Sequence, residues 1–306
     1  MHDLIIIGAG PTGLTAGLYG GRYRLNTLIL EKMAAGGQIV LSQTIENFPG
    51  FPGGIATEEL IERFKKQVDE VGVTIKDAEV IAIEKDPRSA NTYLIKTKDG
   101  SLQSRCVIIA TGASWKRLGV PGEDRLIGKG VSYCGTCDGP FFRNKEIVVV
   151  GAGDRAFEDA IFLTTYASKV TMIHRRQGFR CAKILEEKAR ANPKINFILD
   201  TVIEDILGEN KVEGVRLKNT VDGRVSQLAC QGVFVFIGVG PNSAFVKDKL
   251  NSDENGFIIT DDAMRTNLAG IFACGDCRKR PLYQVITGCG EGAVAAHSAH
   301  TYLLNK

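Results

Sequence analysis

The feature that most constrains this 306-residue chain is an apolar run, a glycine turn and a helix at its N-terminus. Residues 4–7 lead into Gly8-Ala9-Gly10-Pro11-Thr12-Gly13, then into a helical stretch that ends near Arg22 and a second apolar run at residues 27–30. Gly8, Gly10 and Gly13 permit a tight turn, close approach to a pyrophosphate and close packing of helix on sheet. Glu31, directly after the second run, is placed to accept hydrogen bonds from ribose hydroxyls. The pattern predicts a dinucleotide-binding unit.

The same pattern recurs in the middle of the chain. Residues 146–150 lead into Gly151-Ala152-Gly153-Asp154-Arg155-Ala156, a helical stretch and another apolar strand at 169–173. Where the first unit has its acid, the second has His174-Arg175-Arg176, followed by Arg180. A carboxylate repels a ribose 2′-phosphate, whereas arginines pair with it. The first site therefore favours a dinucleotide with a free ribose hydroxyl, and the second favours NADP over NAD. In the alternative interpretation, these arginines form only a solvated strand end.

The intervening segments suggest how the two units combine. Short β-like runs at 79–84 and 92–97 predict a small hairpin layer, and strands are expected at 107–109, 232–237 and 270–273, with a helix from about 290 to 304. We expect an α/β fold with two Rossmann-like three-layer dinucleotide-binding domains, the second inserted into the first. The expected domains are residues 1–113 with 245–306, and residues 114–244.

Composition excludes several other classes of protein. The net charge of +3 is too near balance for a nucleic-acid or membrane partner bound through bulk charge. The N-terminal apolar run is too short for a signal-peptide core, and every apolar run is far below the ~18 residues of a membrane span. We expect a cytoplasmic protein. Eight cysteines are too few for a disulfide scaffold, so in a reducing compartment a close pair indicates catalysis or metal binding.

Such a pair, Cys134-Gly135-Thr136-Cys137, stands before the second unit and is followed by Asp138. We expect Cys137 to open a helix, whose N-terminus lowers a thiolate pKa, and Asp138 to exchange a proton with a departing thiolate. A zinc site would need a second pair, and Cys274-Gly275-Asp276-Cys277 is one. The wide separation of the two pairs and the lack of histidines at ligand spacing argue against metal. We expect no metal, whereas a second redox pair at Cys274 and Cys277 stays open.

Taken together, these motifs resemble the low-molecular-weight, bacterial-type thioredoxin reductases of the flavin disulfide reductase family. The resemblance covers essentially the whole chain, and its most specific element is the CGTCDG sequence at 134–139. The other matching motifs are GAGPTG at 8–13, GGQ at 36–38, IENFPG at 45–50, ATG at 110–112, GAGDRAFE at 151–158, HRRQGFR at 174–180 and GD at 275–276.

The resemblance implies FAD in the first domain and NADPH in the inserted domain that carries the cysteines. Glu31 would bind the adenosine ribose, Gln38 and Asn47 would lie near the flavin, and Asp276 would lie near the ribityl chain and pyrophosphate. Further FAD contacts are expected at Gly37, Thr111, Gly112, Gly275 and Gln284. The NADPH contacts would come from Gly151, Gly153, Asp154, Arg155, His174, Arg175, Arg176 and Arg180.

The implied reaction carries electrons from NADPH through FAD to the Cys134–Cys137 disulfide and on to oxidised thioredoxin. Cys137 would be nearer the flavin, Cys134 would attack the substrate disulfide, and Asp138 would act as acid and base. Because nicotinamide and cysteines share one domain, the resemblance implies that this domain rotates between two orientations. It also implies a homodimer.

Two positions depart from the family pattern. Members commonly have serine at the position of Arg155, and arginine before glutamine where this chain has Tyr283-Gln284. Arg155 adds charge and bulk near the pyrophosphate, so NADH or reduced ferredoxin stays open as an alternative donor, although the HRR and Arg180 pattern favours NADPH. A non-enzymatic alternative is a nucleotide-bound zinc protein that uses all four cysteines of the two pairs.

Overall fold

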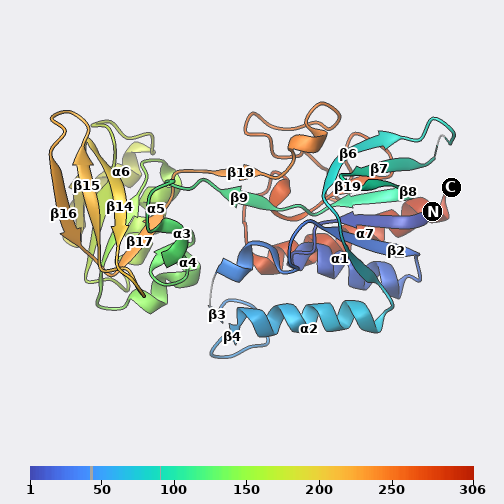
Figure 1. Ribbon diagram of the computed structural model, residues 1–306, viewed down its shortest axis with the longest axis horizontal. Coiled ribbons are helices and arrows are strands. Elements are labelled where there is room, and N and C mark those ends of the chain that lie inside the picture. The colour runs from blue at the N-terminus through green and yellow to red at the C-terminus, as the bar shows by residue number, and fades with distance from the viewer. Residues whose placement is uncertain (42–43, 90) are drawn as a thin grey trace. The chain divides into compact units, whose positions relative to one another are not determined.

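A computed structural model describes residues 1–41, 44–89 and 91–306. The chain divides into unit 1, made of Met1–Ser114 and Gly240–Lys306, and unit 2, Trp115–Val239 (Figure 1). The two crossings between units fall within β9 (Ala113–Trp115) and β18 (Val239–Pro241), which pair with each other. The chain passes between the units after residue 114 and again after residue 239. The sequence predicted these boundaries after residues 113 and 244.

Unit 1 is built around a parallel sheet in the order β5-β2-β1-β8, with β19 also paired to β8. Its strands are β1 (His2–Ile7), β2 (Thr27–Glu31), β5 (Thr74–Asp77), β8 (Gly100–Ile109) and β19 (Ile271–Ala273). Ile7 is in register with Leu30 and Ile109, so the strands end together at one edge. The glycine turn and the segments after β8 and β19 therefore meet at the carboxyl edge, where doubly wound folds bind ligands.

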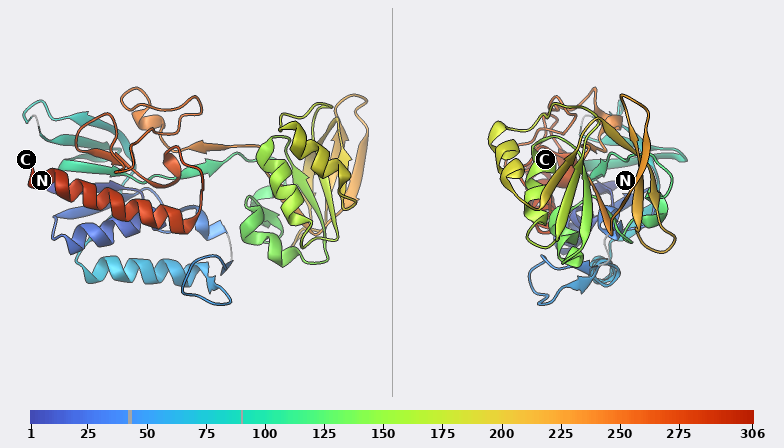
Figure 2. Two further views of the ribbon diagram at one scale, coloured as in Figure 1. Left: turned by 180° about the vertical axis from the view of Figure 1, so that it is seen from behind. Right: turned by 90° about the vertical axis from the view of Figure 1, so that its left-hand side faces the viewer.

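Helices cover one face of this sheet and a hairpin covers the other, giving three layers. The helical layer contains α1 (Pro11–Arg22), α2 (Thr57–Glu70) and α7 (Val285–Leu304), and α7 lies along α1 (Figure 2). The antiparallel pair β6 (Val80–Lys85) and β7 (Tyr93–Thr97) continues from β8 and contributes Ile83, Tyr93 and Ile95 to the opposite core cluster. The remaining short elements of unit 1 are β3 (Thr44–Ile45), β4 (Ile55–Ala56), η1 (Gly37–Leu41), η3 (Ala244–Val246) and η4 (Gly275–Cys277).

The C-terminal helix begins at Val285 and not near residue 290, as the sequence had suggested. The first turns contain three glycines, at 288, 290 and 292, and glycine disfavours a helix interior, so the sequence does not indicate a helix there. A capping box joins Gln284 and Thr287, which fixes the start of the helix. Added Cβ atoms at Gly288 and Gly292 would collide with Thr12 of α1, so these two glycines permit close packing of the two helices.

This packing gives a stability prediction. In Gly292→Ala, the new methyl group meets the backbone oxygen of Thr12, and we expect the free energy of unfolding to fall by about 1–3 kcal/mol. Gly290→Ala is the matched control, because nothing lies within 4 Å of its added Cβ and it should gain about 0.5–1 kcal/mol from helix propensity. Urea denaturation followed by circular dichroism measures both. Equal stability of the two variants would contradict the packing argument.

Unit 2 repeats the layered design. Its parallel sheet has the order β10-β17-β11-β12-β13. α5 and α6 pack with one core cluster, and the three-stranded antiparallel sheet β14-β15-β16 packs with the other. The bounds are β10 (Val131–Ser132), β11 (Glu146–Val150), α5 (Asp154–Leu163), β12 (Lys169–Ile173), α6 (Lys183–Ala191), β13 (Ile195–Ile198), β14 (Thr201–Leu207), β15 (Gly214–Asn219), β16 (Val225–Ala229) and β17 (Gly232–Val235), with short helices α3 (Glu123–Leu126), α4 (Gly135–Asp138) and η2 (Gly139–Phe142). The predicted α/β class with two Rossmann-like three-layer domains is confirmed.

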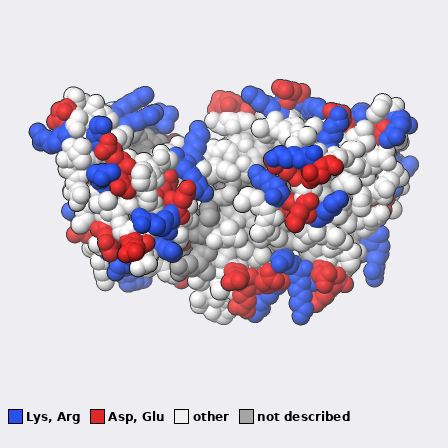
Figure 3. Space-filling view, viewed as in Figure 1, with Lys and Arg blue, Asp and Glu red and all other residues white. Residues whose placement is uncertain are grey.

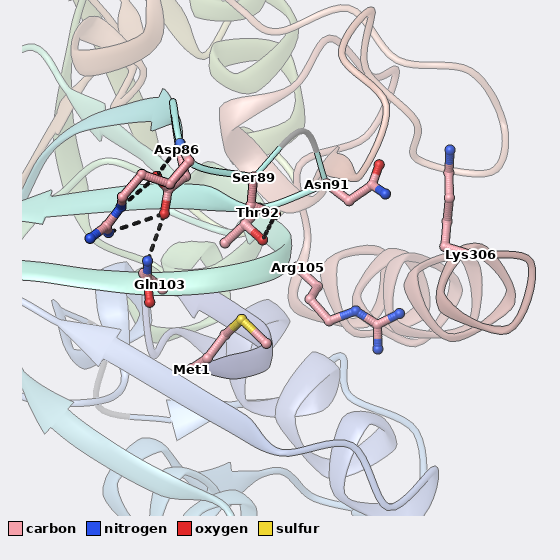
Figure 4. Close-up of a pocket in the computed structure, with 9 residues that line it drawn as sticks. Met1, Asp86, Ser89, Asn91, Thr92, Gln103, Arg105 and Lys306 are labelled. Carbon is pink, nitrogen blue, oxygen red and sulfur yellow. Dashed lines mark hydrogen bonds and ion pairs between the residues drawn. The ribbon is translucent and has the colours of Figure 1, made fainter.

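A cavity of about 310 Å³ in unit 1 lies at the amino end of β1, away from the glycine turn (Figure 4). Its polar centre is Asp86, which accepts hydrogen bonds from Arg88 and Gln103. Arg88 is the main cause of a pKa of Asp86 lowered to about 2. These hydrogen bonds hold the β6–β7 turn against β8. The polar groups of the cavity therefore have a structural role.

Acidic and basic side chains are interspersed on the face of the molecule seen in Figure 3. This mixture accords with the small net charge of +3. Among the helices of the described residues, none combines the length and the apolar character needed to cross a membrane.

Candidate active site

The first glycine turn is built by close approaches that only glycine permits. Gly8 has φ +106°, and an added Cβ on Gly13 would collide with the Gly8 backbone oxygen. The Glu31 carboxylate accepts the Ala9 N–H at 2.7 Å, which fixes the acid at the end of β2 beside the turn. Gly10 and Gly37 also approach each other, since a Cβ on Gly37 would lie 3.2 Å from the Gly10 Cα.

Other expected first-site residues gather around the carboxyl edge of the same sheet. The Thr111 hydroxyl donates to the backbone oxygen of Asn242, and Gly112 has φ +66° with nothing within 4 Å of an added Cβ. The Asn47 amide donates to the Gln284 side chain at 3.0 Å, although these residues are far apart in sequence. Gln38 follows Gly37 in η1 and is exposed. Gly275 and Asp276 form η4, directly after β19.

A buried ionic group beside Asp276 had no signal in the sequence. Arg280 has a side chain only 2% exposed, and it pairs with Asp276 and Glu291. Glu291 also accepts the Gly275 N–H at 2.8 Å, so α7 fixes the turn that presents Asp276. The guanidinium lies 5.2 Å from the Tyr283 ring centroid, and its Nε has no hydrogen-bond partner among the described residues. The glycine cradle, the fixed acid and the buried cation suit a dinucleotide that carries phosphate charge.

The second glycine turn has the same geometry in unit 2. Gly151 has φ +148°, and an added Cβ there would collide with the Phe236 backbone oxygen. Gly153 caps α5 without a side-chain cap and has open space at its Cβ position, so the first N–H groups of α5 are accessible to a phosphate. Asp154 accepts the Ala182 N–H at 2.6 Å, and the Arg180 N–H donates to the Ala152 oxygen at 2.8 Å. Asp154 thus anchors the arginine-bearing loop to the turn.

The arginine-bearing loop follows β12 and places three cations beside this turn. Arg175, Arg176 and Arg180 are exposed, and within the described parts of the chain none of them forms an ion pair. His174 lies at the end of β12, and its pKa is lowered, mainly by burial and further by the neighbouring arginines. Unpaired guanidinium groups beside a phosphate-binding turn fit a nucleotide with an additional phosphate.

The redox-active turn of unit 2 is formed by Cys134 and Cys137, which are joined by a disulfide. We expected Cys137 to open a helix. That expectation is wrong, because α4 begins at Gly135 and Cys134 is its N-cap. The Cys137 N–H donates to the Cys134 sulfur at 3.2 Å, and the Thr136 hydroxyl lies 3.5 Å from the same sulfur. Cys134 is therefore the sulfur already surrounded by donors that favour a thiolate.

Asp138 is fixed by Ser132, a residue that sequence reasoning missed. The Ser132 hydroxyl lies 2.6 Å from Asp138 Oδ2 and 3.2 Å from the Cys134 oxygen, and it accepts the Cys134 N–H at 3.1 Å. A hydroxyl has one proton, and the shorter distance directs it to the carboxylate. Ser132 is 4% exposed at the end of β10, so its orientation is set by the strand.

We expect Ser132→Ala to lower the rate of disulfide reduction by about 10-fold or more, because a hydrogen bond to a charged group is lost. Ser132→Thr keeps the hydroxyl and is the control. An unchanged rate in Ser132→Ala would show that Ser132 does not position Asp138.

The second cysteine pair, Cys274 and Cys277, is not joined. Both thiols are free and fully buried, and they belong to different core clusters. The Cys277 sulfur lies 3.4 Å from the Ile109 oxygen and 3.3 Å from the Cys274 oxygen, and its one proton can go to either. Burial raises the pKa of Cys277 to about 11 and raises that of Cys274 as well. These placements support apolar filling, and they support neither a second redox pair nor a zinc site.

Each unit has a glycine turn, and the second unit also contains the Cys134–Cys137 disulfide. This is the arrangement of a nucleotide-dependent disulfide reductase. Comparison with known proteins agrees with this class. The family described as Pyridine nucleotide-disulphide oxidoreductase matches residues 2–298. Thioredoxin reductase of Peptoclostridium litorale is 45% identical, covering 99% of this chain and 97% of that protein, and the Treponema pallidum enzyme is 44% identical with the same coverage. The crystal structure of thioredoxin reductase from Streptococcus pyogenes has a TM-score of 0.94 at 43% identity, covering 100% of this chain and 99% of that one.

The chain therefore belongs to the pyridine nucleotide-disulphide oxidoreductase family. Within that family it is one of the low-molecular-weight thioredoxin reductases, as the resemblance of its motifs had indicated. It is a flavin-dependent enzyme that acts on disulfides.

Proposed function

We propose that this chain takes electrons from NADPH, holds FAD in unit 1, and reduces thioredoxin through the Cys134–Cys137 disulfide. The observation that supports the choice of donor is a group of three exposed arginines beside the second glycine turn, which form no ion pair with any other described residue. The thioredoxin-reductase names of full-length relatives support the partner.

In unit 1, Gly8, Gly10 and Gly13 would receive the FAD pyrophosphate and Glu31 the adenosine ribose. Asn47 and Gln284, already hydrogen bonded to each other, would lie toward the flavin, and Asp276 would be held by Arg280. In unit 2, Gly151 and Gly153 would receive the NADPH pyrophosphate. The remaining expected contacts are Gly37, Gln38, Thr111, Gly112 and Gly275 for FAD, and Asp154, Arg155, His174, Arg175, Arg176 and Arg180 for NADPH.

A bound flavin supplies the electron pair that it receives from the nicotinamide nucleotide. With that pair on Cys137, the sulfur–sulfur bond breaks, and Cys134 leaves as a thiolate that takes a proton from Asp138. The Cys137 N–H favours this departure, because it already donates to the Cys134 sulfur.

Reduction of the substrate then proceeds by thiol–disulfide exchange. Asp138 takes back the proton, and the Cys134 thiolate attacks one sulfur of the thioredoxin disulfide, whose other sulfur leaves and is protonated. Cys137 attacks the mixed disulfide, which restores the Cys134–Cys137 bond and releases the second thiol. Two electrons from the nicotinamide nucleotide and two protons would thus reach thioredoxin, one proton being the hydrogen of the transferred hydride and the other coming from solvent.

The choice of donor is tested by stopped-flow bleaching of the bound flavin. The purified protein should be yellow, and NADPH should bleach it faster than NADH or reduced ferredoxin. Bleaching by ferredoxin alone would overturn the proposed donor and leave the disulfide chemistry in place. A colourless protein that cannot take up FAD would overturn the whole proposal.

We further propose a cytoplasmic homodimer whose inserted domain rotates between its two electron-transfer partners. Six of the eight cysteines are free thiols, which suits a reducing compartment. Light scattering after size-exclusion chromatography measures the oligomeric state.

A further inference from the structure

Arg155, the residue that departs from the family pattern, connects the second glycine turn to the redox-active turn. It is the second residue of α5, directly after the turn at Gly151–Gly153. Its guanidinium carbon lies 4.4 Å from the Trp115 ring centroid and 5.8 Å from that of Phe236. Its Nε lies 3.5 Å from Asp159 Oδ2, one helical turn further along α5. All of these residues belong to unit 2.

Of this ion pair, Asp159 is the residue that lies against the redox-active turn. Its side chain is 15% exposed, and an added Cβ on Gly135 would lie 2.9 Å from its Oδ1, so the carboxyl packs directly against the residue after Cys134. Burial raises the pKa of Asp159, Arg155 opposes this rise, and Glu158 adds to it. The redox-active turn contributes the backbone of Gly135 at this contact. Arg155 is thus the cation that favours the ionised form of this partly buried carboxyl, against the residue that follows Cys134.

We propose that Arg155 is a coupling residue that binds Asp159 in the free enzyme and the pyrophosphate of the nucleotide in the complex. The proposal rests on the proposed nucleotide site, and adds that binding there changes the charge that faces the redox-active turn.

The geometry favours such an exchange. The contact with Asp159 is a single, long ion pair, and its arginine side chain is 43% exposed whereas its carboxyl side chain is 15% exposed. Water on the arginine side weakens such a pair and leaves the guanidinium free to turn. A phosphate group accepts two parallel hydrogen bonds from a guanidinium, which is among the strongest charge-assisted arrangements. The N-terminus of α5 draws phosphate to within reach of a side chain that starts on its first turn. When Arg155 turns to the phosphate, the buried Asp159 loses its cation and takes up a proton from solvent.

The chain has a built-in reporter, because Trp115 is its only tryptophan. NADP⁺ is the probe, since it binds without reducing the flavin. Titration of the yellow holoenzyme should change the Trp115 fluorescence as the cation leaves the ring face, and a pH indicator in weak buffer should record proton uptake. Equilibrium dialysis measures binding separately.

Three variants test the assignment. Arg155→Met should weaken NADP⁺ binding about 10-fold and abolish both the fluorescence change and the proton uptake. Asp159→Asn should bind NADP⁺ and change fluorescence, but without proton uptake. Arg216→Met is the matched control, because Arg216 pairs with Asp205 at 3.1 Å and is 42% exposed, close to the exposure of Arg155. It should behave as the wild type. Arg155→Gln, which also removes the charge, replaces Arg155→Met if that variant does not fold.

The outcomes separate this inference from the proposed function. If NADP⁺ binds, and the fluorescence change and proton uptake persist in the Arg155 variants, the coupling is overturned while the nucleotide site stands. If Asp159→Asn still takes up the proton, Asp159 is not the acceptor and the coupling is overturned as well. If no NADP⁺ binds to the wild type, both the nucleotide site and the coupling fall.

Discussion

A Cys137→Ser variant is expected to lose the reduction of oxidised thioredoxin completely, while NADPH still bleaches its flavin at close to the wild-type rate. Among the described residues, Cys134–Cys137 is the disulfide that can store the electron pair as a dithiol, and this variant lacks it. A serine hydroxyl forms no disulfide, so the mixed disulfide with the substrate could not be resolved. Steady-state NADPH oxidation with thioredoxin present and single-turnover flavin absorbance measure the two halves separately.

The matched control is Cys181→Ser, which changes a free, partly buried thiol in the same unit. Burial raises the pKa of Cys181, so this thiol is a poor nucleophile, and its loss should leave thioredoxin turnover intact. Turnover of thioredoxin by Cys137→Ser at more than background rate would contradict the role of the disulfide.

Local patterns in the sequence were sufficient for the two mononucleotide folds. Glycine turns between apolar strands are short-range features, and the positions of Gly8 and Gly151 follow from φ values that other residues avoid. The acid at Glu31 was also predictable, because the end of one parallel strand lies beside the turn after its neighbour. The layered fold follows from strands that are apolar on both faces.

Features that depend on contacts between distant segments could not be predicted. The sequence placed the start of α7 five residues too late. The glycines in its first turns are explained only by the close packing of α7 against Thr12 of α1. The buried ion pair of Arg280 and Glu291 could be predicted only from the knowledge that α7 lies beside η4. Likewise, Ser132 contacts Asp138 only because β10 ends just before the redox-active turn. Sequence motifs mark the reacting groups, whereas the groups that hold them are fixed by tertiary structure.

The two units differ most where a nucleotide would present its ribose. Unit 1 fixes a carboxylate there through the Ala9 N–H, and unit 2 places its arginine loop there through Asp154. In both units a backbone N–H that donates to a carboxylate sets the position of the discriminating charge. In the proposed function, the same backbone would therefore serve two different dinucleotides, with selectivity supplied by a few side chains at one edge of each sheet.

Replacing both Arg175 and Arg176 with alanine is expected to raise the KM for NADPH by about 100-fold and to leave the KM for NADH nearly unchanged. Each charge-assisted hydrogen bond to a 2′-phosphate contributes about 1.5–3 kcal/mol, equivalent to roughly 10- to 150-fold in affinity, and NADH lacks this phosphate. Arg224→Ala is the control, because that exposed arginine of unit 2 pairs with Asp222 on the turn between β15 and β16. Steady-state kinetics with both donors measure the ratio. An equal loss for NADPH and NADH would show that the arginines support the loop and do not read the phosphate. An unchanged preference would mean that the exposed cations are a solvated strand end, and the donor would then have to be sought elsewhere.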